Sequence, residues 1–196
     1  EMKKILFLAL IIAIVSCKKN ELPVCELTSP ADSTRFFNRD SILININASD
    51  LDGELSYVEL ALNETNLKMF QAPPYNYTLL LENYSPGTYT ISAVATDNEG
   101  AQTEDEVTIT VGAVPSCSFV SPIESSVFLI GDTIAVEINA EDTDGEIVSL
   151  DLFFNETSLT TLNNSPYSYS FILNDFTMGI YELLAIATDD EGAQTE

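Results

Sequence analysis

The sequence predicts an all-β protein made of two tandem β-sandwiches after a helical leader, with the last strand of the second sandwich missing. Residues 25–104 align without a gap on residues 117–196, at a constant shift of 92 residues. Short runs alternate apolar and polar residues, which is typical of strands with one buried face. Asp-Gly, Pro-Gly and Glu-Gly turns separate these runs, and beyond the leader no stretch has the 3.6-residue apolar spacing of a helix.

The repeat has the size of an independent domain, because solenoid units are shorter, at about 20–50 residues. We therefore divide the chain into a leader (1–17), a linker (18–24), a first domain (25–112), a second linker (113–116) and a second domain (117–196). The second copy stops at Glu196, before the counterpart of the alternating segment 105–111. We therefore expect the chain to be a fragment of a longer protein.

The leader has the features of an export signal. Lys3 and Lys4 precede an apolar run at residues 5–15, which is too short to span a bilayer. Ser16 and Cys17 follow directly, and a small residue before a cysteine at this place resembles the lipobox of bacterial lipoproteins, in the looser form of Bacteroidetes. The resemblance implies cleavage before Cys17 and lipid on its thiol, hence an exported protein anchored in the outer membrane or at the cell surface. An ordinary secretory signal with an incidental cysteine is the alternative.

The expected strands come in pairs, one from each repeat. In order, they lie at 41–48 and 133–140, 58–62 and 150–154, 77–81 and 169–173, and 89–95 and 181–187. Their apolar positions hold mostly Ile, Leu, Val and Ala, which form the expected core. Cys25 and Cys117 are repeat counterparts on the inward face of an earlier strand, so we expect two small buried thiols and no disulfide within a domain.

Charge and composition exclude several classes of function. The chain has 31 acidic and 7 basic residues, a net charge of −24 and no histidine. Such a chain repels phosphate backbones, which excludes a nucleic-acid partner. The absence of histidine excludes Ser-His-Asp and Cys-His catalysis and most zinc sites. The acidic residues recur in turns of both repeats, so we expect no enzyme activity from them.

Patterns that both repeats share resemble a bacterial immunoglobulin-like domain. Each repeat has Ser-Pro near its start, then Asp-x-Asp-Gly, Pro-Tyr-x-Tyr and Gly-x-Tyr-x-[Ile/Leu]-x-Ala-x-Ala-Thr-Asp-x-Glu-Gly-Ala. The resemblance implies a disulfide-free immunoglobulin-like sandwich, a type often repeated along secreted and surface proteins. It also implies a tyrosine corner at Tyr89 and at Tyr181.

Acidic loops gather at one end of each domain in this topology, because the turns after the second and sixth strands lie together. Carboxylates there are candidate ligands for calcium, the only cofactor that the sequence suggests. The alternative is turn chemistry, since Asp-Gly favours tight turns and Asp caps its own backbone. The candidate ligands are Asp50, Asp52, Asp97 and Glu99 in the first repeat and Asp142, Asp144, Asp189 and Glu191 in the second.

Two further motifs are candidates for modification or binding. Ser41 and Thr133 each follow Asp and precede Ile, which resembles the O-glycosylation motif of Bacteroidetes; a polar turn entering a strand is the alternative. Aromatic faces also bind sugar rings, although an alternating strand favours packing in the core. The tyrosines concerned are Tyr75, Tyr77, Tyr167 and Tyr169.

These features support two hypotheses of function. The first is a lipid-anchored cell-surface protein whose modules form a stalk or an adhesion surface for a carbohydrate or protein ligand. The second is a spacer in front of a secreted hydrolase that acts on polysaccharide or protein, with its catalytic domain beyond Glu196. Fold alone does not separate them, because sandwiches host many roles.

Overall fold

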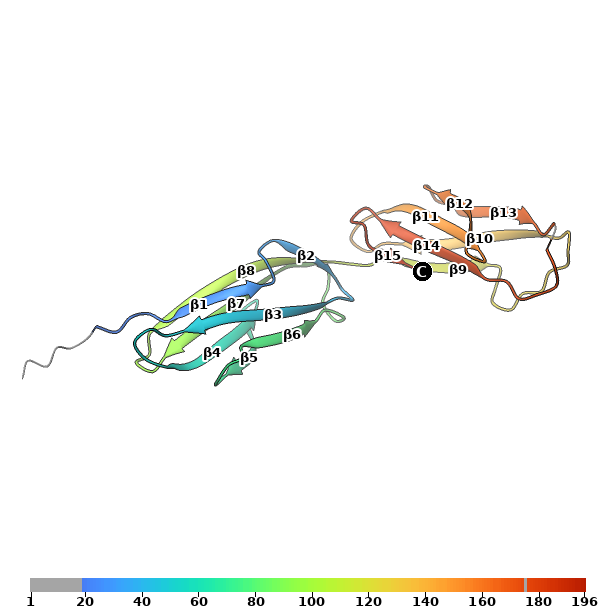
Figure 1. Ribbon diagram of the computed structural model, residues 1–196. Helices are drawn as coiled ribbons and strands as arrows, with labels where there is room; N and C mark the ends of the chain where they lie inside the picture. Colours follow the sequence, from blue (N-terminus) through green and yellow to red (C-terminus); the bar gives the residue numbers. More distant parts are fainter. Residues whose placement is uncertain (1–18, 175) are drawn as a thin grey trace, which may run out of the picture.

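The computed structural model describes residues 19–174 and 176–196, a part of the chain that contains strands and no helix. The predicted signal peptide and Cys17 lie outside the described residues. Within these ranges, no helix is long and apolar enough to cross a membrane. Figure 1 shows two sandwiches that follow one another along the chain, which confirms the predicted fold class.

The first module consists of two sheets packed face to face. One sheet has the strand order β1-β3-β6, and the other has the order β2-β8-β7-β4-β5. All pairs are antiparallel except β2 with β8, which is parallel. The strands are β1 (Val24–Ser29), β2 (Thr34–Phe37), β3 (Ser41–Ser49), β4 (Leu55–Leu62), β5 (Thr65–Phe70), β6 (Asn76–Leu80), β7 (Gly87–Asp97) and β8 (Gln102–Gly112).

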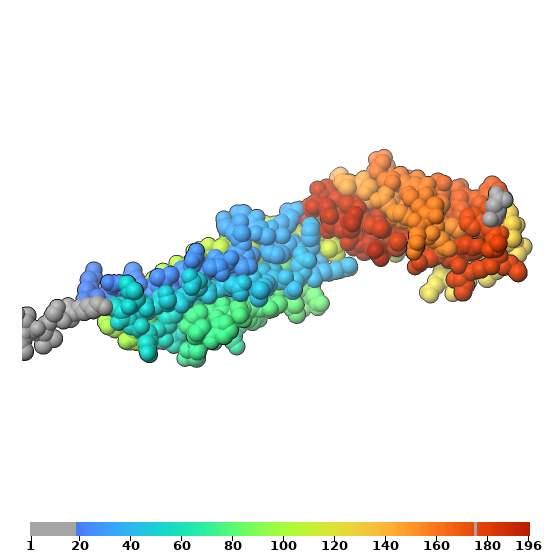
Figure 2. Space-filling view, in the orientation of Figure 1, coloured from blue at the N-terminus to red at the C-terminus, as the bar shows by residue number. Residues whose placement is uncertain are grey.

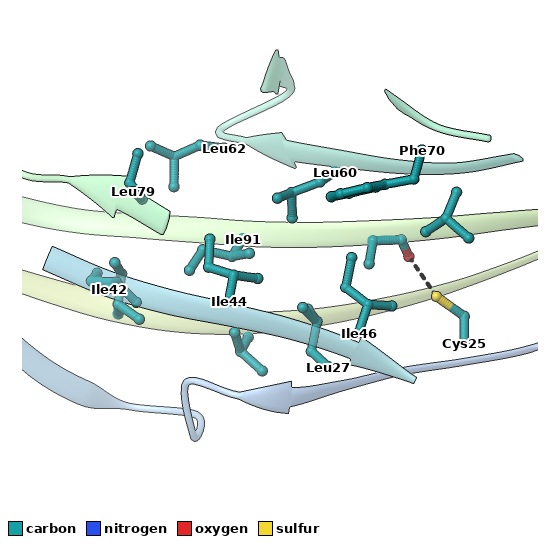
Figure 3. Close-up of a cluster of buried hydrophobic side chains, with 14 of the residues drawn as sticks. Cys25, Leu27, Ile42, Ile44, Ile46, Leu60, Leu62, Phe70, Leu79 and Ile91 are labelled. Carbon is teal, nitrogen blue, oxygen red and sulfur yellow. Dashed lines mark hydrogen bonds between the residues drawn. The ribbon is translucent and has the colours of Figure 1, made fainter. Parts of the chain in front are cut away.

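The core of the first module comes from the alternation seen in the sequence. On β3, Ile42, Ile44 and Ile46 are buried while the residues between them face outward. Figure 3 shows these side chains meeting Leu60 and Ile91 from the opposite sheet. Burying aliphatic side chains in this way supplies the main stabilising free energy of a sandwich, at about 1.5–3 kcal/mol per side chain.

The second module repeats this plan with a shorter last strand. Its sheets have the orders β13-β10-β9 and β12-β11-β14-β15. The predicted absence of the last strand needs a small correction: β15 forms, but it is only two residues long and pairs with Ala187 and Thr188. The strands are β9 (Ser116–Ser121), β10 (Thr133–Glu141), β11 (Ile147–Phe154), β12 (Thr157–Leu162), β13 (Tyr167–Ile172), β14 (Leu183–Asp189) and β15 (Gln194–Thr195).

The segment of the second module that corresponds to β2 forms no strand. In the first module, β2 pairs with residues 109–112 of β8. The counterpart segment 126–129 has no such partner and forms irregular chain. In this segment Val127 is 90% exposed and Leu129 is 72% exposed.

Two tyrosine corners confirm the resemblance to immunoglobulin-like domains. The Tyr89 hydroxyl donates a hydrogen bond to the Ser85 carbonyl at 2.8 Å. The Tyr181 hydroxyl donates to the Thr177 carbonyl at 2.9 Å. Each tyrosine stands four residues after its acceptor, so it ties the start of β7 or the chain before β14 to the preceding loop.

Cys25 and Cys117 are free thiols, as predicted, but they differ in burial. Cys25 is buried, and its thiol donates to the Ala93 carbonyl at 3.4 Å (Figure 3). Cys117 is only partly buried, and its sulfur lies 3.9 Å from the Ala185 carbonyl. Burial raises the pKa of both thiols, which keeps them protonated and unreactive at neutral pH.

Candidate functional site

The two acidic loops of each module are joined by hydrogen bonds at one end of the sandwich. In the first module, the Glu54 N–H donates to Asn98 Oδ1 at 3.0 Å, and the Asn98 N–H donates back to the Glu54 carbonyl at 2.9 Å. In the second module, Glu146 and Asp190 make the same pair of bonds. The loop after β3 and the loop after β7 are therefore neighbours, as are their counterparts after β10 and β14.

At the centre of each loop pair is a buried aspartate. Asp97 and Asp189 are each only 1% exposed. Asp97 Oδ1 accepts the N–H groups of Glu99 and Ala101, both at 2.8 Å. Asp189 Oδ1 accepts the counterpart groups of Glu191 and Ala193 at 3.0 and 2.7 Å. One oxygen of each aspartate thus holds its own turn, which is the role that turn chemistry predicts.

The second oxygen of Asp97 is bound by the chain that enters the module. Asn20 Nδ2 donates to Asp97 Oδ2 at 2.7 Å, and the Glu21 N–H donates to Asp52 Oδ1 at 3.2 Å. The Asn20 amide, helped by N–H groups of the turn, holds the pKa of Asp97 below its usual range. Sequence reasoning missed Asn20, because it lies in the linker, far along the chain from Asp97.

The linker between the modules enters the second loop pair in the same way. The Ala113 N–H donates to the Asp144 carboxylate at 3.1 and 3.2 Å from its two oxygens. Burial raises the pKa of the neighbouring Asp142 carboxyl, and the charges of Asp144 and Asp189 raise it further. Negative charge is therefore less well compensated here than around Asp97.

An ion pair joins the two modules beside this linker. Arg35, on β2 of the first module, pairs with Glu191 Oε1 in the last loop of the second. Glu99, the counterpart of Glu191, is exposed. The two repeats therefore place these predicted calcium ligands differently.

The predicted calcium site stays a prediction. Throughout residues 19–174 and 176–196, no three Asp, Glu, Cys or His side chains converge in a geometry that could hold a metal ion. The structure brings Asp142 and Asp189 close enough to repel one another, and Asp144 contacts the linker. In the first module, Asp50 lies in the same loop pair, and neither of its carboxylate oxygens has a hydrogen-bond partner among the described residues.

Both candidate glycosylation residues are exposed at the first position of a strand. Ser41 begins β3 and Thr133 begins β10. The preceding aspartates act in the turn, since Asp40 Oδ2 accepts the Phe37 N–H and Asp132 Oδ2 accepts the Leu129 N–H, both at 2.8 Å. Glycosylation stays a prediction, and the hydroxyl groups are accessible for it.

The tyrosines considered for sugar stacking mostly pack within their modules. Tyr75 meets the Phe70 ring edge-on at 6.0 Å, and Tyr167 is only 7% exposed. Tyr169 stacks on Phe171 at 6.3 Å. A shallow surface hollow of about 310 Å³ beside Tyr75 is also lined by Pro73 and Pro74. In this hollow, the Tyr75 ring borders a concave surface of the first module.

The chain matches a family of bacterial domains and part of some longer bacterial proteins. The family described as "Bacterial Ig domain" matches residues 23–93 and 115–185. An ulvan lyase (long isoform) of Alteromonas sp is 32% identical over 119 residues, which are 56% of this chain and 12% of that protein. Another, from Pseudoalteromonas sp. (strain PLSV), is 29% identical over 121 residues, 57% of this chain and 12% of that protein. The chain thus spans only a small part of the length of these relatives.

A solved structure supports the fold alone. The N-terminal eight Ig domains of the Down Syndrome Cell Adhesion Molecule match with a TM-score of 0.51 and 10% identity. The match covers 85% of this chain and 27% of that one. At this identity, the likeness concerns the arrangement of strands and says nothing of a ligand.

Proposed function

Because this chain belongs to the bacterial Ig domain family, we propose that its two modules form a non-catalytic stalk in an exported, lipid-anchored surface protein. The observation that supports this most is the short and restrained connection between the modules. β8 ends at Gly112 and β9 begins at Ser116, so the connection is very short. The Arg35–Glu191 ion pair and the bond from Ala113 to Asp144 further limit motion there. Figure 2 shows the resulting end-to-end arrangement.

The anchor in this proposal is Cys17, which precedes the first module in the sequence. To test it, the protein would be expressed in a bacterium with an outer membrane and labelled with an alkyne-tagged fatty acid. We expect the wild type to take up label and to fractionate with membranes, and Cys17→Ala to do neither. Cys25→Ala is the matched control and should behave as the wild type. Equal labelling of the wild type and Cys17→Ala would contradict the anchor.

The stalk proposal predicts that the two modules keep a stable elongated shape in solution. Small-angle X-ray scattering of residues 19–196 should fit two sandwiches in a single end-to-end arrangement. A curve that fits only a broad ensemble of compact and extended pairs would contradict a stiff spacer. This measurement does not depend on the lipid, so it separates the mechanical proposal from the anchoring proposal.

A second candidate function is favoured by the similarity to ulvan lyases. In this reading, the modules are an accessory part of a larger polysaccharide-active protein, without catalytic groups of their own. Affinity electrophoresis tests for binding: retardation in a gel that contains ulvan, reduced by Tyr75→Ala, would support a binding module. Unchanged mobility in ulvan would leave spacing as the role of these residues.

A further inference from the structure

Three carboxylate oxygens in the second module are buried beside the linker without a donor. They are Asp142 Oδ2, Asp189 Oδ2 and Glu191 Oε2, and none has a hydrogen-bond partner among the described residues. Asp189 is only 1% exposed, so its side chain is almost completely shielded from water. We call these three side chains the junction cluster.

The surroundings of Asp189 differ from those of its counterpart Asp97 at one decisive position. In the first module, Asn20 donates an amide N–H to Asp97 Oδ2. The residue 92 positions later is Gly112, which has no side chain and therefore no donor to offer Asp189. A Cβ atom at Gly112 would lie 2.5 Å from Glu191 Oε2. Where the first module places an amide, the second places a third carboxylate oxygen.

Other contacts of the loop pair are the same in both modules. Asp189 Oδ1 holds its turn as Asp97 Oδ1 does. Ala113 donates to Asp144 as Glu21 donates to Asp52. Asp142 Oδ2 has an unpartnered counterpart in Asp50, whereas Asp97, the counterpart of Asp189, has the Asn20 amide on its Oδ2. The unpartnered Oδ2 of Asp189 therefore follows from the loss of that amide.

Buried carboxylates need compensation by donors or by positive charge. Arg35 supplies positive charge to Glu191 Oε1, but Oε2 of the same residue faces Gly112. Asp142 and Asp189 lie close enough to repel one another. A hard divalent cation would compensate all three oxygens at once, because oxygen ligands are what such ions prefer.

We propose that the junction cluster binds one Ca²⁺ ion, with Asp142, Asp189 and Glu191 as its carboxylate ligands. The three side chains do not yet surround one point. Glu191, whose carboxylate stands at the end of a flexible side chain, has to turn toward the two aspartates. Ca²⁺ tolerates irregular ligand geometry and takes main-chain carbonyls and waters as further ligands, whereas Mg²⁺ demands a near-ideal octahedron. The ion would tie the linker to the second module at the place where the modules meet.

The first test is calorimetric titration of the full chain with CaCl₂ up to about 10 mM, which exceeds the roughly 10⁻⁴–10⁻³ M dissociation constants of many extracellular calcium modules. We expect one saturable site per chain, with Mg²⁺ binding at least tenfold more weakly. Absence of saturable binding would overturn the proposal. Equal affinity for Mg²⁺ would also overturn it, because simple charge screening would then explain the signal.

The decisive variant is Asp189→Asn, which keeps Oδ1 for the turn and replaces the unpartnered Oδ2 with an uncharged amide group. We expect Ca²⁺ to bind at least tenfold more weakly, while the melting temperature in EDTA is no lower than that of the wild type. The second readout excludes simple misfolding as the cause of the lost binding. Wild-type affinity in Asp189→Asn would overturn the proposal.

Two control variants separate this site from general acidity. Glu137→Gln removes one exposed negative charge from β10, and Asp97→Asn changes the counterpart of Asp189 in the first module. We expect both to keep the wild-type affinity. A loss of affinity in Glu137→Gln would indicate unspecific attraction, and a loss in Asp97→Asn would move the site to the first module; either result would overturn the assignment.

Discussion

At the scale of single residues, the tyrosine corners are the clearest local ties. The Tyr89 hydroxyl bonds to the Ser85 carbonyl, and the Tyr181 hydroxyl makes the counterpart bond to Thr177. We predict that Tyr89→Phe lowers the free energy of unfolding of the first module by about 0.5–1.5 kcal/mol, the net value of one hydrogen bond. Urea denaturation gives this value. Tyr181→Phe should have a similar effect on the second module, and an unchanged midpoint in both variants would contradict a stabilising role.

Asp32 is a residue whose charge state links stability to pH. Asp32 Oδ1 accepts the Thr108 N–H at 2.8 Å, and Oδ2 accepts the Ser33 hydroxyl at 3.1 Å. The first of these bonds is the main reason that the pKa of Asp32 is lowered in the folded protein. A lowered pKa stabilises the fold at pH values above the unfolded pKa of about 3.9, and this contribution is lost as the pH falls through the folded pKa.

Replacing Asp32 should therefore flatten the pH dependence of the first module. We predict that Asp32→Asn is less stable than the wild type at pH 7 and that the difference shrinks toward pH 3. Urea denaturation at both pH values measures it. The counterpart residue Glu124 is exposed in irregular chain, so Glu124→Gln is the control and should show no such trend. A constant difference between wild type and Asp32→Asn at both pH values would contradict the linkage.

At the scale of secondary-structure elements, the strands that cross the centre of each sandwich carry the core. Leu60 on β4 is fully buried, and its counterpart Leu152 on β11 is buried in the same way. We predict that Leu60→Ala lowers the free energy of unfolding by about 2–5 kcal/mol, because it removes apolar contacts and leaves a cavity. Thermal and urea denaturation measure the loss. Lys68→Ala on the neighbouring β5 is exposed and should change stability by less than about 0.5 kcal/mol.

The two modules differ in the length of their last strand. β8 is long enough to pair with both β7 and β2. β15 pairs only with Ala187 and Thr188 of β14. In the segment before β10, Val127 and Leu129 are largely exposed, and Val127 stands at the position of the exposed Arg35 on β2.

At the scale of the whole molecule, the junction controls how the two modules move. The Arg35–Glu191 pair is partly exposed, with side-chain exposures of 43% and 19%. Such pairs contribute about 0–1 kcal/mol, and salt screens them. We predict that Arg35→Ala hardly changes the stability of either module but broadens the distribution of distances between them.

Pulsed electron–electron double resonance between spin labels on the two modules can measure this distribution of distances. High salt should broaden the wild-type distribution in the same direction. Arg39→Ala, which removes an exposed arginine four residues further along the chain, is the matched control and should leave the distribution unchanged. Equal distributions in the wild type and Arg35→Ala at low salt would contradict a role for the ion pair.

The sequence by itself determined the duplicated all-β architecture and the meeting of the acidic loops at one end of each module. It could do so because alternation of apolar residues and turn chemistry act over a few residues. Only the tertiary structure decided that Asp97 Oδ2 accepts the Asn20 side-chain amide while Asp189 Oδ2 has no hydrogen-bond partner among the described residues, and that Glu191 pairs with Arg35 of the first module. Those contacts join residues far apart in the chain, Asn20 with Asp97 and Arg35 with Glu191. Identical local motifs therefore acquire different electrostatic surroundings once the chain is folded.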